Sequence, residues 1–271
     1  MPAARVATPA LPAGAAPSSE QAAAAPMAVA FGTVRITELA GFPPAPPPAG
    51  GCYFYLTLNA EISLAAASSD TLHRLVESPR LRVSVDGQWI LWALRRKYAH
   101  IEIQKLAGSD LIYRLAEHCH EGGRRLLLLG GAEAPNTEAV RRLRARFPAA
   151  RIEGFSPPWF DPRSADWHDV RGLIRERIEA VVPDYIVCGL GAPKEQAWAL
   201  DEADWLEARQ VTGVFFFGGA IDFASGHLRR APLAWQRVGM EGLHRVLQQP
   251  RRWRRLLKVL RILAVIASGR Y

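Results

Sequence analysis

The segment VPDYIVCGLGAPKEQAW, residues 182–198, contains a short apolar run that ends at a glycine turn and leads into a charged, amphipathic helix. This order is typical of a ligand-binding strand end in a parallel α/β sheet. Glycine lets the backbone approach a ligand closely, and the following helix presents N–H groups and a positive dipole end to an anion. The segment therefore favours a phosphate-bearing ligand, although a Gly-x-Gly turn alone is equally consistent with a plain chain reversal.

Apolar and amphipathic segments alternate along most of the chain, as they do in α/β proteins. Strands are predicted at 53–58, 81–85, 124–131, 151–155, 184–191 and 211–219. Helices are predicted from Asn59 toward Glu77, at 110–121, 133–146, 166–181 and 194–208, and in the C-terminal segment. This alternation predicts an α/β, Rossmann-like fold with a mostly parallel sheet and helices on both faces.

The composition divides the chain into three parts. Residues 1–50 are rich in alanine and proline and lack apolar periodicity, so a largely disordered arm is expected there, with one strand at Ala28–Ile36. An α/β catalytic domain is expected at 51–226, and a basic helical appendage at 227–271. Prolines interrupt the apolar run that a signal peptide needs, and the three cysteines form no CxxC pair. Both features favour a cytoplasmic protein with reduced thiols.

The net charge of +8 is concentrated in the last part of the chain. From His227 to Tyr271 there are eleven lysines and arginines and a single acid, Glu241. Such a concentration of positive charge indicates an anionic partner, which could be a nucleic acid, a phosphorylated substrate or an acidic membrane surface. No nucleic-acid recognition module is present in the sequence, so nucleic acid is not the expected partner.

An apolar stretch at Leu256–Ala267 follows the basic cluster at the C-terminal end. It is shorter than the roughly 20 residues of a membrane span, and it contains Lys258 and Arg261. It suits a helix at a membrane interface, with apolar residues in the acyl boundary and cations among anionic headgroups. The alternative is a terminal helix that packs on the core and exposes its basic face.

Polar or glycine residues follow each predicted strand, and in a parallel sheet these ends share one edge, where ligands bind. They are Thr57 and Asn59, Asp86 and Gly87, Gly130 and Gly131, Ser156 and Pro157, Gly189 and Gly191, and Gly218, Gly219 and Asp222.

Individual residues at these ends have structural as well as functional interpretations. Asp86 is either part of an Asp-Gly hairpin turn or a carboxylate that accepts a proton from a substrate hydroxyl. Thr57 and Asn59 are either strand-end and helix-cap residues or substrate ligands. His118 and His120 are two residues apart on a predicted helix and point to different sides, so no metal site and no cofactor are expected.

Eight motifs, in this order, resemble those of the WecG/TagA/CpsF family of bacterial glycosyltransferases, glycosyltransferase family 26. The resemblance covers about Tyr53 to Arg255. Its motifs are Thr57-Leu58-Asn59-Ala60-Glu61, Asp86-Gly87, Gly108-Ser109-Asp110-Leu111, Leu129-Gly130-Gly131, Gly189 to Trp198, Gly218 to Asp222, Gly226 to Pro232, and Gln249 to Arg252.

The resemblance implies an inverting, metal-independent hexosyl- or N-acetylhexosaminyltransferase with a GT-E-like C-terminal appendage. The donor would be a UDP-sugar and the acceptor a polyprenyl-diphosphate-linked glycan in cell-surface or exopolysaccharide biosynthesis. The enzyme would be peripheral on an anionic membrane, at the cytoplasmic face of the plasma membrane, and could form a homo-oligomer. A non-catalytic nucleotide-binding or scaffold homologue and a nucleic-acid-binding protein are the alternatives.

By this resemblance Asp86 is the general base, and Thr57 and Asn59 hold the substrate. The remaining substrate-binding residues would be Gly131, Gly189, Gly191, Pro193, Glu195, Gln196, Asp222, Arg230, Arg237, Arg245 and Arg251, the arginines pairing with diphosphate and lipid headgroups. The family reads Pro-Lys-Gln-Glu where this chain has Glu195 and Gln196 in exchanged order. Because of this exchange, the resemblance does not identify the donor sugar.

Overall fold

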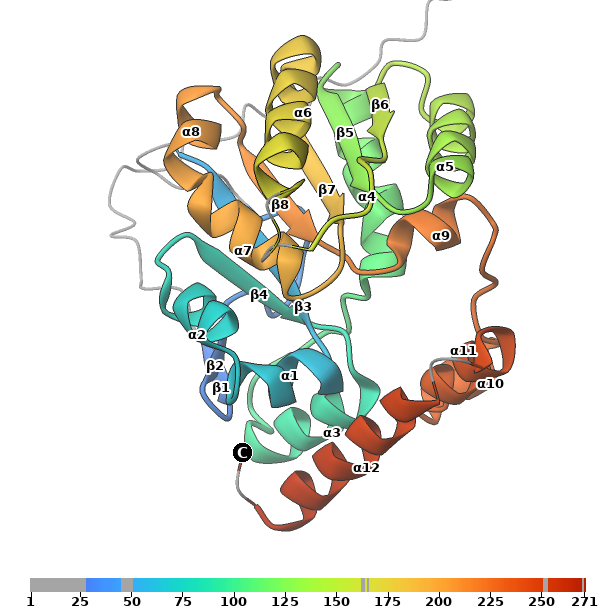
Figure 1. Ribbon diagram of the computed structural model, residues 1–271. Helices are drawn as coiled ribbons and strands as arrows, with labels where there is room; N and C mark the ends of the chain where they lie inside the picture. The colour runs from blue at the N-terminus through green and yellow to red at the C-terminus, as the bar shows by residue number, and fades with distance from the viewer. Residues whose placement is uncertain (1–27, 45–50, 162–163, 165, 251–252, 270) are drawn as a thin grey trace, which may run out of the picture.

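The computed structural model describes residues 28–44, 51–161, 164, 166–250, 253–269 and 271, and a six-stranded sheet forms its centre (Figure 1). The strand order is β4-β3-β8-β7-β5-β6, and every neighbouring pair is parallel. The bounds are β3 Tyr53–Leu58, β4 Leu81–Val85, β5 Arg125–Gly130, β6 Arg151–Phe155, β7 Tyr185–Gly189 and β8 Gly213–Phe216. The predicted Rossmann-like α/β fold is confirmed.

Helices cover both faces of this sheet (Figure 1). One face carries α6 (Asp166–Val181), α7 (Lys194–Asp201) and α8 (Ala203–Ala208). The other carries α4 (Gly108–Glu121), α5 (Glu133–Arg146) and α9 (Ala220–Ala224). Each face therefore has its own apolar core.

Strand β3 shows how the sequence supplies both cores. Phe54 and Leu56 pack on the α6 face, whereas Tyr53 and Tyr55 pack on the α4 face, and all four are buried. A strand that is covered on both sides must be apolar throughout, and burial of each such side chain stabilises the fold by about 1.5–3 kcal/mol.

The predicted single strand at Ala28–Ile36 is wrong, because the chain reverses within it. Strands β1 (Val29–Phe31) and β2 (Val34–Ile36) form an antiparallel pair around Gly32, whose φ of +59° suits the turn. After the hairpin, the backbone N–H groups of Thr37 and Glu38 donate to the carbonyl of Val83 in β4. The segment thereby covers an edge of the sheet that would otherwise be open to pairing with another chain.

The predicted helix from Asn59 toward Glu77 is two helices, α1 (Ala60–Ala66) and α2 (Asp70–Glu77). The break occurs because Ser69 caps α2 with its hydroxyl, which accepts from the N–H of Leu72. The predicted helix at 194–208 is likewise divided into α7 and α8, with Glu202 between them. Helix α3 (Gln88–Lys97), directly after Asp86-Gly87, was not predicted.

The C-terminal segment forms α10 (Leu233–Arg237), α11 (Glu241–Gln248) and α12 (Arg254–Ala267). Helix α12 lies beside α1 and α3 at the lower end of the molecule (Figure 1). Its Ile262 is buried, and Lys258 Nζ donates to Glu61 Oε1 at 2.6 Å. Among the described helices, none combines the length and apolarity needed to cross a bilayer.

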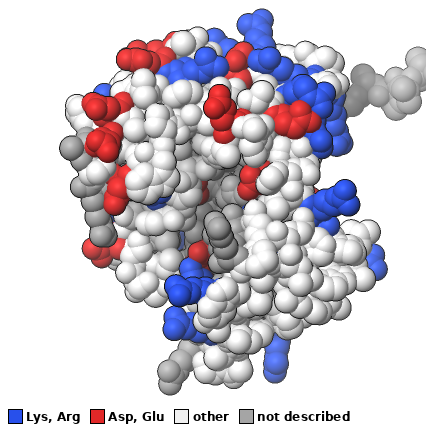
Figure 2. Space-filling view, turned by 45° about the vertical axis from the view of Figure 1, so that its right-hand side comes forward, with Lys and Arg blue, Asp and Glu red and all other residues white. Residues whose placement is uncertain are grey.

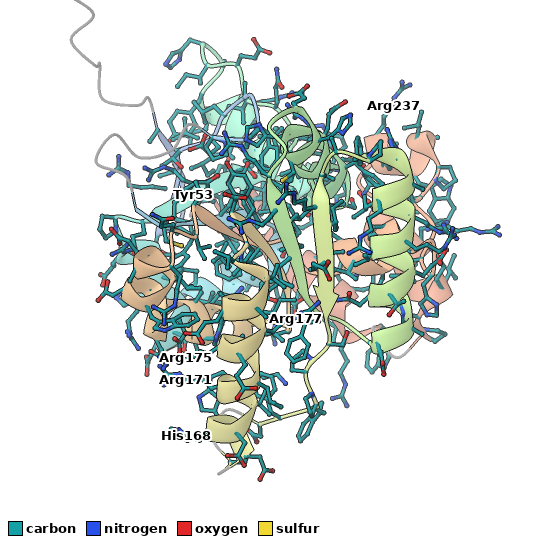
Figure 3. All side chains as sticks on the ribbon, turned by 90° about the horizontal axis from the view of Figure 1, so that it is seen from above. Tyr53, His168, Arg171, Arg175, Arg177 and Arg237 are labelled. Atoms are coloured by element: carbon teal, nitrogen blue, oxygen red, sulfur yellow. The ribbon has the colours of Figure 1, made fainter. Side chains whose placement is uncertain are left out.

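A buried carboxylate joins the α6 layer to the break between α7 and α8. The side chain of Glu202 is fully buried and bonds to Arg171 and Arg175, which lie one turn apart on α6 (Figure 3). The distance from Arg175 Nη2 to Glu202 Oε2 is 2.8 Å. Removal of the carboxylate would leave two partly exposed guanidinium groups without the partner that they share.

We expect Glu202→Ala to lower the free energy of unfolding by about 2 kcal/mol, because the charge-assisted hydrogen bonds to Arg171 and Arg175 are lost. Urea denaturation followed by circular dichroism measures this. The exposed Asp204→Ala, two residues further along in α8, is the control and should leave the midpoint nearly unchanged. Equal midpoints for Glu202→Ala and the wild type would show that the buried ion pair contributes nothing to stability.

Candidate active site

Two adjoining cavities open at the carboxyl edge of the sheet, where the strand ends meet as expected. The first, called the rim chamber, has a volume of about 320 Å³ and is lined mainly by the ends of β3, β5, β7 and β8. The second, called the helix chamber, has a volume of about 220 Å³ and lies toward α3, α11 and α12. Both chambers are lined by Asn59, Glu61, Asp86, Phe217, Gly219 and Arg245.

Asp86 lies where the two chambers meet. It follows β4 directly, and its backbone N–H donates to the carbonyl of Leu58 at 2.9 Å, which ties it to the end of β3. Gly87 then begins α3 as its N-cap. The hairpin interpretation is wrong, because β3 and β4 are parallel and the chain after Gly87 is helical.

The carboxyl group of Asp86 is a stronger base than an ordinary aspartate. Burial, and next the negative charge of Glu241, raise its pKa to about 6, while Lys105 and Arg230 oppose the rise. A carboxyl with this pKa is ionised at neutral pH and accepts a proton more readily than a solvated one.

A cluster of charged side chains surrounds Asp86 on the helix-chamber side. Lys105 Nζ lies 3.1 Å from Glu241 Oε2, and Arg230 bonds to Glu241, to Ser109 and, at 2.7 Å, to Asp110 Oδ2. Arg230 thus shapes the charge around Asp86 through protein partners.

Sequence reasoning missed Lys105 and Glu241 as members of this cluster. A parallel bridge between Val85 and Lys105 places the lysine beside the end of β4, which is a tertiary pairing without a local signal. Glu241 did carry a signal, since it is the single acid in an otherwise basic segment.

Thr57 and Asn59 leave β3 at the junction of the chambers. Thr57 is buried and lines the rim chamber. Asn59 Oδ1 accepts from the N–H groups of Glu61 at 2.9 Å and Ile62 at 3.1 Å, so the predicted helix-cap role of Asn59 is confirmed. Asn59 also lines both chambers, which leaves its predicted substrate contact as a prediction.

At the glycine turns beside the rim chamber, the backbone conformation and the close packing disfavour any residue with a side chain. Gly130 and Gly131 have φ values of +99° and +74°, and a Cβ atom at Gly130 would lie 2.6 Å from the carbonyl carbon of Gly189. Asn136 Nδ2 supports the same turn by donating to Gly130 O at 2.7 Å. Gly191, with a φ of +90°, completes the chamber on the β7 side.

Glu195 and Gln196, the exchanged pair, lie beside the Gly191 turn in the first turn of α7, where both are buried and line the rim chamber. Glu195 Oε2 accepts from the N–H of Gly191 at 3.0 Å, and Oε1 accepts from Gln196 Nε2 at 3.1 Å. Glu195 therefore holds the turn while it lines the chamber, which leaves its predicted substrate contact as a prediction. Burial raises its pKa to about 7, although these hydrogen bonds act against the rise.

The other predicted binding residues differ in their placement. Asp222 lines the rim chamber from α9, and Pro193 precedes α7 without lining either chamber. Arg245 lines both chambers, and its guanidinium carbon lies 5.3 Å from the ring centroid of Phe223. Arg237 is exposed on α10 at the edge of the molecule, away from both chambers (Figure 3). Arg251 lies outside the described residues.

The histidines at 118 and 120 have separate structural partners. His118 Nε2 lies 3.2 Å from the hydroxyl of Tyr185, whereas His120 Nδ1 accepts from the N–H of Ala149 at 2.9 Å. The described part of the chain contains no group of three or more His, Cys, Asp or Glu that could hold a metal ion.

The sequence model of the glycosyl transferase WecG/TagA/CpsF family matches residues 48–270, more than four fifths of the chain. The match includes every strand of the central sheet and both chambers. It supports glycosyl transfer as the activity, with a sugar donor and a glycan acceptor as the substrates in general terms.

We expect Glu195→Gln to reduce the pH dependence of stability. The pKa of Glu195 is raised to about 7 from 4.5, so between pH 5 and 7 the folded chain keeps a proton that the unfolded chain releases. The wild type should therefore lose up to about 3 kcal/mol relative to Glu195→Gln as the pH rises through this window.

Urea denaturation at pH 5 and pH 8 measures the difference, with the exposed Glu117→Gln as the control. The same loss between the two pH values in wild type and Glu195→Gln would contradict a raised pKa at this position.

Proposed function

The chain belongs to the WecG/TagA/CpsF family of glycosyltransferases, and we propose that it transfers a sugar from a UDP-sugar to a polyprenyl-diphosphate-linked saccharide with inversion. The observation that carries this proposal is the position of Asp86 between two chambers of different character. A base at such a junction can reach a hydroxyl that enters from one side and an anomeric carbon that is held on the other.

The rim chamber suits the donor. Its walls are the glycine turns at Gly131, Gly189, Gly191 and Gly218, where backbone can approach a diphosphate closely. Asp222 lies among them and could accept hydrogen bonds from sugar or ribose hydroxyls.

The helix chamber suits the acceptor. Lys105, Arg229 and Arg230 supply positive charge on one part of its wall. Leu256, Val259 and Ile262 supply an apolar wall from α12. A ligand with a diphosphate next to a hydrocarbon chain matches this combination.

The proposed reaction is a single displacement at the anomeric carbon. The acceptor oxygen forms the new bond as its proton passes to the Asp86 carboxylate, and the bond from the anomeric carbon to the UDP oxygen breaks with its electron pair leaving on UDP. One displacement inverts the anomeric centre. Arg245 faces both chambers and would offset the charge that develops on the departing diphosphate.

We further propose that α12 and α11 rest on the cytoplasmic face of an anionic membrane. Leu247, Trp253, Leu257 and Leu260 are all exposed, and Arg261 is exposed beside them. Figure 2 shows this lower part of the molecule as mostly white surface with lysine and arginine side chains at its margin. Exposed apolar groups with flanking cations are typical of an interfacial helix.

We expect Asp86→Asn to lower the rate of sugar transfer by about 100-fold or more, since an amide cannot take the acceptor proton. The assay is release of UDP from UDP-glucose, UDP-N-acetylmannosamine and UDP-glucuronate in the presence of a polyprenyl-diphosphate glycan. Asp70→Asn, a surface change on α2, is the control. Turnover by Asp86→Asn at the wild-type rate would remove Asp86 from the role of base.

Two further variants should move the acid limb of the pH profile of kcat/KM in opposite directions. Glu241 raises the pKa of Asp86 and Lys105 lowers it. Glu241→Gln is therefore expected to shift the limb to lower pH and Lys105→Met to higher pH, each by roughly half a unit or more. Shifts in the same direction, or no shifts, would show that the acid limb reflects the titration of a group other than Asp86.

Loss of exposed apolar groups from α12 should release the protein from membranes. The double variant Leu257→Gln and Leu260→Gln is expected to abolish most co-flotation with vesicles containing phosphatidylglycerol. Leu173→Gln, an exposed leucine on α6, is the matched control and should float as the wild type does. The membrane proposal fails if the double variant floats equally well.

A further inference from the structure

Glu241 is the single acid in residues 227–271, which contain eleven lysines and arginines, and the fold places it against two cations of the helix chamber. Its Oε2 lies 3.1 Å from Lys105 Nζ, and its Oε1 accepts from Arg230 Nη1. All three side chains line the helix chamber, and none of them lines the rim chamber. Glu241 therefore neutralises cations that the diphosphate of the proposed acceptor would need.

The two cations have supports that do not depend on Glu241. Arg230 Nη2 donates to Asp110 Oδ2 at 2.7 Å, and Arg230 Nη1 also donates to the hydroxyl of Ser109. The backbone of Lys105 is held at the end of β4 by the parallel bridge described above. Both cations can therefore remain at the chamber wall when the carboxylate moves away from them.

The position of Glu241 allows its side chain to leave these partners. Glu241 is the first residue of α11, and a quarter of its side chain is exposed. A partly exposed ion pair contributes little net free energy, because water competes for both partners. The carboxylate can thus turn into solvent at the edge of the chamber while the rest of α11 stays helical.

A diphosphate is a stronger partner for the same two cations. It carries more negative charge than a carboxylate, and its oxygens accept from a guanidinium in bidentate fashion. A diphosphate close to Glu241 would also repel the carboxylate, since both are negative. Lys105 and Arg230 would consequently exchange an internal anion for an external one.

We propose that Glu241 is an internal counter-ion that occupies the diphosphate site of the helix chamber in the free protein and is displaced when a prenyl diphosphate binds. This inference rests on the proposed function, because it assigns the resting occupant of the acceptor site. In the free protein the same contact with Lys105 holds α11 against the α/β domain. The competition lowers the apparent affinity for an anion according to the fraction of time in which the cations are free.

Isothermal titration calorimetry with geranyl diphosphate, a short and soluble prenyl diphosphate, tests the displacement. Glu241→Gln should bind it about tenfold more tightly than the wild type, because a neutral amide competes less with the ligand. Lys105→Met should bind it more weakly. UDP should bind equally to the wild type and to Glu241→Gln, since Glu241 does not line the rim chamber. Glu117→Gln, which removes an exposed acid from α4, is the control for the change in net charge.

The outcomes separate this inference from the function on which it rests. Equal or weaker binding of geranyl diphosphate by Glu241→Gln overturns the displacement, since the carboxylate would then not compete with the ligand. The same gain in Glu117→Gln, or a parallel gain in UDP affinity, also overturns it, because net charge alone would explain the effect. These results leave the helix chamber as the acceptor site. If neither the wild type nor Glu241→Gln binds geranyl diphosphate, the proposed acceptor site and the counter-ion both fail.

Discussion

The parallel pairing of β3 with β4 on one side and with β8 on the other brings Asn59, Asp86 and Phe217 to one edge of the sheet. Parallel strands need crossover connections, and here helices make them and occupy both faces. The carboxyl edge is consequently the place where loops from distant parts of the chain can meet. Both chambers, and the position of Asp86 between them, depend on this arrangement.

Asp86 and Glu195 are two of the described carboxyl groups whose pKa values burial raises, and they have different surroundings. Glu195 lines the rim chamber and accepts hydrogen bonds from the Gly191 N–H and from Gln196. Asp86 has no side-chain hydrogen bond among the described residues and faces both chambers, with Lys105 and Arg230 close enough to limit the rise of its pKa. The contrast is in the hydrogen bonds that each carboxylate accepts, since burial raises the pKa of both and both line the rim chamber.

Local patterns predicted the sheet and much of the helical layer well. The bounds of α5 and α6 agree with the prediction because apolar periodicity and flanking turns are properties of short windows. The strand ends could be predicted for the same reason. The β1–β2 hairpin was missed because its alternating residues on either side of Gly32 also fit one strand. The break at Ser69 was missed because a single cap interrupts a continuous amphipathic pattern.

The parts of the site that sequence did not predict depend on contacts across the fold. Lys105 reaches the edge through a bridge to Val85, and Glu241 reaches it from a helix more than 130 residues further along the chain. The role of Glu195 could not be assigned from its motif, because an acid at a helix start can face a ligand or turn inward. The packing of α7 does both, since Glu195 bonds to the Gly191 turn and lines the rim chamber.

The crystal structure of Asp86→Asn with a bound UDP-sugar tests the central claim most directly. The account predicts that the diphosphate lies in the rim chamber on the glycine turns, with the anomeric carbon facing the side chain at position 86 and its far face open to the helix chamber. A nucleotide bound in the helix chamber, or an anomeric carbon turned away from position 86, would contradict it.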